Sequence, residues 1–308
     1  MNETNNLGEP TSAMIRCGYV AIIGRPNVGK STLMNQLLHV KLSIVTPKPQ
    51  TTRQRVLGIL NEPGTQAIFL DTPGLIAPQY ALQTAMMKIA DQSMEAADVL
   101  LIMIDGTSKA ESDFVQELFK TKLLHSDIPK VLAINKVDRM AKPELLPMMD
   151  TYIKTGFFKE VIPISALEND GVEQMKQALF KYLPLNPPFY PPDALTEQPE
   201  RFFVAEIIRE KIFLHYTQEV PYSTEVVIEE FKERERGKDL IRAIIIVERD
   251  SQKAILIGKK GEALKRIGET ARKDIEAFLD RQVFLELWVK VKEEWRSNDA
   301  MLRSLGYR

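Results

Sequence analysis

The segment with the clearest chemical meaning is a glycine-rich stretch near the N-terminus, Gly24-Arg25-Pro26-Asn27-Val28-Gly29-Lys30-Ser31, followed by Thr32. It matches G-x-x-x-x-G-K-[ST], and it lies between an apolar run at 19–23 and a helical pattern that starts at Ser31. Glycines let backbone N–H groups wrap a phosphate chain, and a helix N-terminus adds positive potential. Lys30 can supply a charge to the β- and γ-phosphates, and Ser31 a hydroxyl to Mg²⁺. We therefore predict a nucleoside-triphosphate site.

A second motif, Asp71-Thr72-Pro73-Gly74, directly follows the apolar run 67–70. A carboxylate at the end of a strand can reach Mg²⁺ directly or through water, and Gly74 can present its N–H to the γ-phosphate. In Ras-like enzymes the next residue is a glutamine that orients the attacking water, but here it is Leu75, which cannot form a hydrogen bond with water. We therefore predict hydrolysis well below the ~10 s⁻¹ of a typical enzyme.

Two further segments, each after an apolar run, predict which base is bound. Asn135-Lys136-Val137-Asp138 follows the run 131–134, and Ser165-Ala166 follows the run 161–164. Asp138 can accept hydrogen bonds from guanine N1–H and the exocyclic amine, and such a site can discriminate by ~10⁴ or more. We expect Lys136 to lie across the base, Asn135 to tie its loop to the phosphate loop, and the Ala166 N–H to meet guanine O6.

Mg²⁺-assisted phosphoryl transfer also requires a threonine in a loop that closes over Mg²⁺ and the γ-phosphate. The stretch Gln50-Thr51-Thr52-Arg53 lies between the first helix and Asp71, where such a threonine is required. We choose Thr52, with Thr51 as the alternative, so the predicted Mg²⁺ ligands are Ser31, Thr52 and Asp71. The predicted catalytic residues are Lys30, Thr52, Asp71 and Gly74. Taken in order, the four motifs resemble the translation-factor-like GTPases. Asn27 resembles the asparagine that helps to bind K⁺ in related GTPases, so K⁺ is a second candidate cofactor.

The length and composition place these motifs in a larger chain. At roughly 100–200 residues per domain, 308 residues indicate about two domains, and a net charge of −1 neither favours nor excludes nucleic acid. Cys17 is the only cysteine, which excludes an intramolecular disulfide and fits a reducing compartment. The first sixteen residues lack the features of a signal peptide, and no run reaches the ~18 apolar residues of a membrane span. We expect a cytoplasmic monomer, with peripheral contact at the inner membrane left open.

Apolar runs that alternate with helical patterns predict the fold of the first part. We expect a P-loop α/β domain over residues 17–184, with a mostly parallel sheet and helices on both faces, after a flexible extension at 1–16. Six prolines between Pro184 and Pro199 predict a linker over 185–200. The remainder, 201–308, predicts a smaller α+β domain with a C-terminal tail.

The second domain contains its own motif, a G-x-x-G loop from Gly258 to Gly261 that encloses Lys259 and Lys260. An apolar segment precedes the loop and a basic amphipathic helix follows it, which is the type II KH pattern for clamping about four nucleotides of single-stranded RNA. We expect apolar residues, among them Ile255 and Ile267, to form the floor of a groove for bases. The predicted RNA-binding residues are Ile257, Gly258, Lys259, Lys260, Gly261, Leu264, Lys265 and Arg266.

A P-loop GTPase followed by a KH domain resembles the Era family. Further stretches carry the resemblance, and they lie at 209–213, 218–223, 287–292 and 302–307. The resemblance implies GTP and GDP binding, binding of the 3′ end of 16S rRNA, and a role in 16S rRNA processing and assembly of the 30S subunit. It also implies that the two binding events are coupled. A physical account of this coupling is that GTP orders the loops at 46–53 and 71–80 and so changes the packing of the KH domain across the proline-rich linker.

Two alternatives remain at this point. One is a regulatory GTPase that acts in cell-cycle control or at the membrane surface, with RNA binding secondary. The other is an RNA-binding module with a degenerate nucleotide domain, which the intact Lys30, Ser31, Asp71 and Asp138 disfavour.

Overall fold

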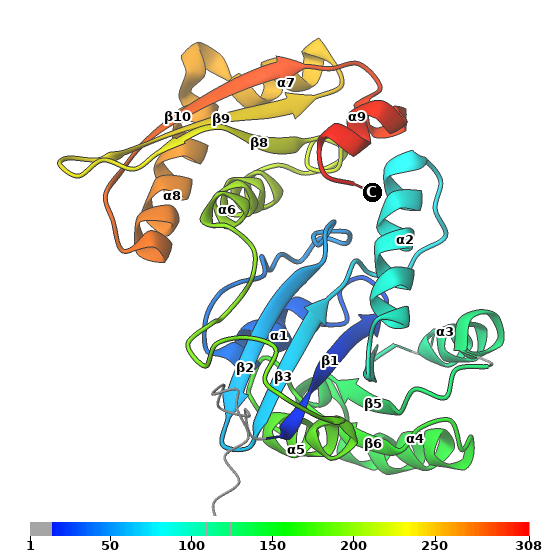
Figure 1. The fold of residues 1–308 in the computed structure, drawn as a ribbon. Coiled ribbons are helices and arrows are strands. Elements are labelled where there is room, and N and C mark those ends of the chain that lie inside the picture. Colours follow the sequence, from blue (N-terminus) through cyan, green and yellow to red (C-terminus); the bar gives the residue numbers. More distant parts are fainter. Residues whose placement is uncertain (1–13, 109, 124, 308) are drawn as a thin grey trace, which may run out of the picture.

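The computed structural model describes residues 14–108, 110–123 and 125–307, which fold into two parts (Figure 1). Of the extension predicted at 1–16, residues 1–13 lie outside the described residues. Ile15 and Arg16 already belong to the first strand, so the prediction of an extension up to residue 16 was wrong at its end. Arg16 pairs with Thr65 of a neighbouring strand, and this pairing explains why the strand begins so early.

The N-terminal part is built on a seven-stranded sheet in the order β2-β3-β1-β4-β5-β6, with β7 beside the start of β1. Strands β1, β3, β4, β5 and β6 run parallel, whereas β2 is antiparallel to β3. The strands are β1 (Ile15–Gly24), β2 (Val56–Glu62), β3 (Thr65–Asp71), β4 (Val99–Asp105), β5 (Lys130–Asn135), β6 (Glu160–Pro163) and β7 (Leu185–Asn186). The runs of continuous apolar residues are buried on both faces, as a central parallel sheet requires.

Helices cover both faces of this sheet. Two of them pack on one face, α1 (Lys30–Leu38) and α5 (Val172–Tyr182), and three on the other, α2 (Ala81–Glu95), α3 (Glu111–Leu118) and α4 (Lys142–Lys154). A π-helical turn at Phe119–Leu123 continues α3, and a 3₁₀ turn covers Val137–Arg139. The predicted P-loop α/β architecture is therefore confirmed, and the chain order brings the loops after β1, β3, β5 and β6 to one edge of the sheet.

The C-terminal part is a three-stranded sheet, in the order β10-β9-β8, with helices packed on one face. Strand β10 is parallel to β9, and β8 is antiparallel to it. The elements are α6 (Glu200–His215), β8 (Glu225–Lys232), β9 (Asp239–Val247), α7 (Asp250–Ile257), α8 (Glu262–Leu279), β10 (Val283–Val291) and α9 (Asp299–Ser304), with 3₁₀ turns at Lys259–Gly261 and Trp295–Ser297. This is the predicted KH-type α+β domain.

The segment between the two sheets is held against the N-terminal part. Gln66 Oε1 accepts hydrogen bonds from the backbone N–H groups of Phe189 (2.7 Å) and Tyr190 (2.9 Å). The N–H of Ile59 in β2 donates to the carbonyl of Leu195 at 2.8 Å. A proline-rich composition excludes regular structure but does not exclude such anchoring, so this connection is fixed at several points.

The two parts also share an apolar interface, which we call the interdomain cluster. Its buried members come from α2, from β9 and from the C-terminal end of the chain, and they are Leu82, Met86, Met87, Ile244, Ile246, Trp295, Leu302 and Tyr307. Figure 1 shows α9 and the C-terminus beside α2. Trp295, Leu302 and Tyr307 therefore lie in a contact between the two domains.

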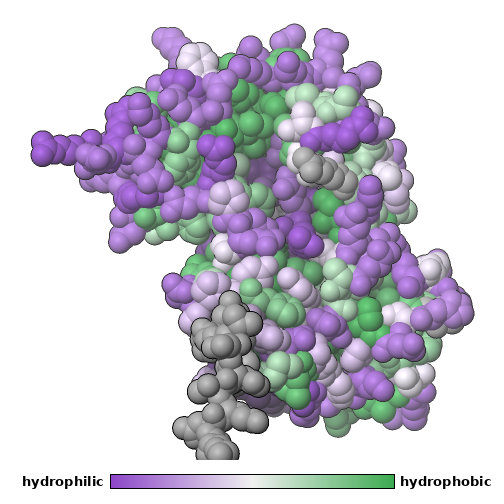
Figure 2. Space-filling view, viewed as in Figure 1, coloured by the Kyte–Doolittle hydropathy of each residue, from purple (hydrophilic) through white to green (hydrophobic). Residues whose placement is uncertain are grey.

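The face of the molecule seen in Figure 2 is mainly hydrophilic, with apolar patches on both domains. Among the described residues, no helix is both long and apolar enough to cross a membrane.

Candidate nucleotide site and RNA groove

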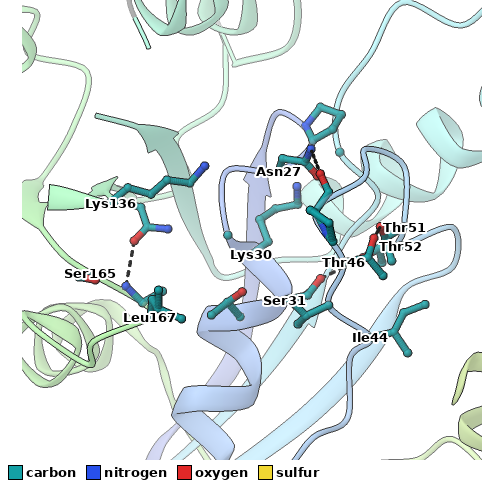
Figure 3. Close-up of a pocket in the computed structure, with 18 of the residues that line it drawn as sticks. Asn27, Lys30, Ser31, Ile44, Thr46, Thr51, Thr52, Lys136, Ser165 and Leu167 are labelled. Carbon is teal, nitrogen blue, oxygen red and sulfur yellow. Dashed lines mark hydrogen bonds between the residues drawn. The ribbon is translucent and has the colours of Figure 1, made fainter. Parts of the chain in front are cut away.

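The first candidate site is a cavity of about 400 Å³ at the edge of the sheet where the parallel strands end. Figure 3 shows its two sides: Lys136, Ser165 and Leu167 lie on one side of Lys30, and the threonines of the loop between α1 and β2 lie on the other. We call this loop, residues 39–55, the switch loop. The cavity therefore collects segments that are far apart in the sequence.

The phosphate loop connects β1 to α1 in a conformation that depends on Gly29. Gly29 has φ +104° and is the residue immediately before α1, and a Cβ here would collide with the side-chain amide of Asn135. The free N–H groups at the start of α1 consequently face the cavity, the usual arrangement of a phosphate site.

Lys30 is held at the floor of this loop and is almost completely buried. Its Nζ donates to the carbonyl oxygens of Gly24 (3.1 Å) and Arg25 (3.0 Å). Burial lowers the pKa of Lys30 to about 8, against the opposing effect of Asp71 and Glu111. A phosphate group placed beside this ammonium would favour its charged form.

Three oxygen-bearing side chains converge next to Lys30. Ser31 Oγ donates to Asp71 Oδ2 at 2.7 Å and lies 3.0 Å from Thr52 Oγ1. Asp71 is fully buried, and among the described residues its Oδ1 has no hydrogen-bond partner. Burial raises the pKa of Asp71, against the opposing effects of Lys30, Ser31 and Ser43. A buried carboxylate with an unused oxygen, beside two hydroxyls, is a donor set that fits Mg²⁺.

The two candidate threonines have different surroundings. Thr51 Oγ1 lies 2.7 Å from Thr46 Oγ1 and donates to the Lys48 carbonyl at 2.8 Å, so it is used within the switch loop. Thr52 is the one that reaches Ser31. The position of Thr52 is consistent with our choice of it over Thr51.

The base side of the cavity is cross-linked through Asn135. Its Nδ2 donates to the Val28 carbonyl of the phosphate loop at 2.6 Å, and its Oδ1 accepts from the Ala166 N–H at 2.9 Å. The first bond is the tie that we predicted. The second bond uses the Ala166 N–H, which we expected to donate to guanine O6. Ala166 can therefore donate to the base only if this N–H shares or releases its bond to Asn135.

Asp138 and Lys136 are both oriented by neighbours. Asp138 Oδ1 accepts from Ser165 Oγ at 2.7 Å, and Lys136 Nζ forms an ion pair with Asp105 at 2.6 Å. Burial raises the pKa of Asp105, but hydrogen bonds from Lys136 and Thr107 outweigh it and hold that pKa below its ordinary value. The sequence reasoning did not identify Asp105, because its role depends on a partner 31 residues away.

Asn27 and Leu75 lie on the phosphate side of the site. Asn27 has φ +64°, and its Nδ2 donates to the carbonyl of Pro47 in the switch loop at 3.1 Å. The Leu75 N–H donates to the Gly24 carbonyl at 3.0 Å, and its side chain packs against apolar clusters. Leu75 therefore provides no polar group to a water at this position.

Several cavity-lining residues were not predicted. They belong mostly to the switch loop and form no sequence motif that would mark them. These residues are Ile44, Val45, Thr46, Pro47, Gln50, Arg139 and Leu167. Gln50 Oε1 accepts from Gln83 of α2 at 3.0 Å, which links the switch loop to the segment after Asp71.

The second candidate site lies at the G-x-x-G loop between α7 and α8. Gly258, Lys260 and Gly261 all have positive φ (69°, 52° and 82°), and Lys259 and Lys260 are exposed. A groove of about 370 Å³ begins at this loop and is lined by Gly261, Leu264, Lys265, Gly268, Glu269, Arg272, Leu285 and Leu287. The loop and the groove thus combine exposed ammonium groups with an apolar floor.

The floor of this groove differs from our expectation. Ile267 is 1% exposed and belongs to the core of the C-terminal domain, and Ile257 also packs against that core. Leu285 and Leu287 of β10 line the groove in their place. Arg266 is exposed but does not line the groove. On a helix with apolar residues at several positions, the sequence alone did not show which of them face the sheet.

Comparisons with known proteins identify both domains. A family model described as "50S ribosome-binding GTPase" matches residues 19–136, and a KH-domain model matches residues 219–296. GTPase Era of Geotalea uraniireducens is 48% identical over 96% of this chain and 99% of its own length. GTPase Era of Geobacter sp. is 50% identical over 95% of this chain and 98% of its own length.

The chain belongs to the Era family of GTPases. The fold agrees with solved Era structures. A variant of Aquifex aeolicus Era bound to GDP and AlF₄⁻ is 43% identical, has a TM-score of 0.90, and the match covers 94% of this chain and 99% of that one. Era in complex with MgGDPNP and nucleotides 1506–1542 of 16S ribosomal RNA is 43% identical, with a TM-score of 0.91 and coverage of 95% and 99%. This Era-family chain is thus a GTPase with a C-terminal KH domain.

Proposed function

We propose that this chain is a GTP-dependent switch that binds the 3′ end of 16S rRNA through its KH domain and assists 16S rRNA processing and assembly of the 30S subunit. The observation that carries the proposal is the similarity, over 95% of the chain, to an Era structure that holds both MgGDPNP and nucleotides 1506–1542 of 16S rRNA. The groove beside Gly261, with its exposed lysines, supports RNA binding in this chain.

The proposed roles in the nucleotide site follow from the geometry. Lys30 neutralises charge on the β- and γ-phosphates, the N–H groups of the phosphate loop and of Gly74 hold the phosphate oxygens, and Asp138 selects guanine. Ser31, Thr52 and Asp71 would hold Mg²⁺, which supplies charge stabilisation for phosphoryl transfer. Lys136 covers one face of the base because its ammonium is fixed by Asp105.

The hydrolytic step lacks a glutamine, since Leu75 is packed into apolar surroundings. We therefore propose slow turnover, assisted by K⁺ bound near Asn27. The Asn27 amide already lies against a carbonyl oxygen of the switch loop, and oxygen atoms at such a point are suitable K⁺ ligands. Turnover measured in KCl and in NaCl at matched ionic strength tests this role: we expect faster turnover in KCl, and equal rates would contradict it.

The RNA assignment is tested by binding of a labelled single-stranded oligonucleotide from the 3′ end of 16S rRNA, measured by fluorescence anisotropy. We expect clearly tighter binding than to a scrambled oligonucleotide of the same length and composition, because base edges are read in the groove in addition to phosphates. Equal affinity for the two would contradict the assignment of this RNA.

A further inference from the structure

One arginine of the switch loop is buried in the other domain. Arg53 is 3% exposed although it lies in a loop of the GTPase domain. Its Nη1 donates to the Thr224 carbonyl (2.6 Å) and to Glu225 Oε2 (2.9 Å), and its Nη2 donates to the carbonyls of Pro221 (3.0 Å) and Tyr222 (3.0 Å). Every partner lies in the C-terminal domain, at or just before the start of β8.

Tyr307 and Trp295 complete the site that binds the Arg53 guanidinium. Tyr307 is 2% exposed, and its hydroxyl donates to the same Glu225 oxygen at 2.7 Å. The fully buried Trp295 ring lies 5.9 Å from the Arg53 guanidinium carbon, and the Trp295 indole N–H donates to the Ser223 carbonyl at 2.9 Å. A buried guanidinium without its partners is energetically costly. Loss of any of these contacts therefore weakens the binding of the Arg53 side chain to the C-terminal domain.

The rest of the switch loop is attached to the same domain through α6. Glu210, 2% exposed, accepts from the Val45 N–H at 3.2 Å and pairs with Lys41 at 2.7 Å. Lys48 Nζ donates to the carbonyls of Phe213 and Tyr216. The C-terminal domain thus contacts this loop at several points along its length.

The residue next to Arg53 is Thr52, which lies 3.0 Å from Ser31 at the proposed Mg²⁺ site. Consecutive Cα atoms are about 3.8 Å apart, so a guanidinium fixed by four hydrogen bonds restricts where the neighbouring threonine can lie. If the start of β8 moved away from the GTPase domain, Arg53 would either follow it or lose its partners.

Building on the proposed function, we propose that Arg53 is a positioning residue for the GTPase site, supported by Glu225 and Tyr307. The C-terminal domain holds Arg53, and Arg53 holds Thr52 over the Mg²⁺ site. Any event that loosens the C-terminal segment from β8 therefore lowers the affinity of the GTP-bound site for Mg²⁺. Regulation of the cycle would then pass through Tyr307 and Trp295.

The test is a Mg²⁺ titration of binding of a fluorescent, non-hydrolysable GTP analogue to the full chain. We expect Arg53→Ala to raise the Mg²⁺ concentration at half-saturation by about tenfold or more, as for groups that orient metal ligands. Arg53→Lys keeps the charge but not the forked geometry, so it should restore part of the effect. Tyr307→Phe removes one hydroxyl and should raise the midpoint by about threefold.

The matched control is Arg55→Ala, because Arg55 lies two residues further along the same loop and its side chain is exposed, with a distant ion pair to Glu197 at 3.9 Å. Its midpoint should stay within about twofold of the unmodified chain. Equal midpoints for the Arg53→Ala, Tyr307→Phe and Arg55→Ala chains would overturn the positioning role and leave the proposed function intact. An unmodified chain that does not bind the analogue would instead contradict the proposed function. If Arg53→Ala does not fold, Tyr307→Phe against Arg55→Ala decides the question.

Discussion

The nucleotide site and the RNA groove are built in different ways. In the nucleotide site most polar side chains already have partners within the protein: Asn135 bonds to Val28, Ser31 to Asp71, and Asp138 to Ser165. The groove beside the G-x-x-G loop has exposed lysines and an apolar floor of leucines, with Lys265 only 3.9 Å from Glu269 as its nearest ion pair. The polar side chains of the first site hold one another in place, whereas the second site is an open surface.

The difference indicates what each site must recognise. Discrimination between bases requires buried polar groups whose geometry is set in advance, because a wrong base then leaves them without partners. An RNA strand is held through phosphates at the G-x-x-G loop as well as through bases in the groove, and the phosphate contacts tolerate more freedom. Substitutions in the first site should therefore change the choice of ligand, and substitutions in the second should mainly change the strength of binding.

The largest effect is expected at Asp138. In Asp138→Asn the amide nitrogen cannot accept from guanine N1–H, whereas the bond from Ser165 can remain on the amide oxygen. The preference for guanine over xanthine should shift by about 10⁴. Competition of GTP and XTP against a fluorescent nucleotide measures this shift, with RNA affinity of the nucleotide-free chain as the control. An unchanged preference would contradict the role of Asp138.

The next largest effect is expected at Gly261 in the G-x-x-G loop. Gly261 has φ +82° with open space beside it, so Gly261→Asp places a negative charge at the RNA surface in a strained conformation. RNA binding should weaken by about 2 kcal/mol, or roughly 30-fold, with GTP affinity unchanged.

Gly64 provides the matched control, because it also has positive φ (+75°) with open space, in the turn between β2 and β3. Gly64→Asp introduces the same charge and similar strain away from both sites. Equal losses of RNA affinity in the two variants would show that general charge or strain, and not the loop, is responsible.

A smaller effect concerns pH and the buried Lys30. Burial lowers the pKa of Lys30 to about 8, and a bound phosphate would raise it. Above pH ~8 binding must therefore take up a proton, so GTP affinity should fall as the pH rises, by at most tenfold per unit. Calorimetric titrations between pH 7 and 9 measure this. Lys30→Arg, which stays charged throughout, should flatten the profile, and an affinity that is constant up to pH 9 in the unmodified chain would contradict the account.

The smallest effect is expected at the exposed lysines of the RNA loop. Each phosphate contact to single-stranded RNA contributes about 0.7 to the slope of log affinity against log salt. Lys260→Ala should reduce this slope by about that amount and weaken specific and scrambled RNA alike. A loss confined to the specific sequence, without a change of slope, would show that Lys260 reads bases and not phosphate.

The sequence predicted the nucleotide site better than the groove. The site motifs are contiguous, each follows a buried strand, and a parallel sheet brings such positions to one edge. The groove floor depends on which face of α8 packs against the sheet. In the structure Ile267 lies in the core, and Leu285 and Leu287 of β10 line the groove. The antiparallel strand β2 was missed for a similar reason, because it is defined by its pairing with β3.

The burial of Arg53 could not be predicted from its surroundings in the chain. Its partners are 168 to 172 residues away, and nothing in the stretch from Gln50 to Arg53 indicates that the arginine leaves its own domain. The anchoring of the proline-rich segment to Gln66 was invisible in the same way. Long-range polar contacts are thus the part of this molecule that required the structure.

The central claim is that the bound nucleotide controls the affinity of the chain for RNA. It is tested most directly by the affinity of the full chain for the 16S rRNA 3′-end oligonucleotide with GDPNP and Mg²⁺, with GDP, and without nucleotide. Because the switch loop contacts both the nucleotide cavity and the C-terminal domain, we expect the tightest binding with GDPNP and clearly weaker binding with GDP. The same RNA affinity in all three states would contradict the account.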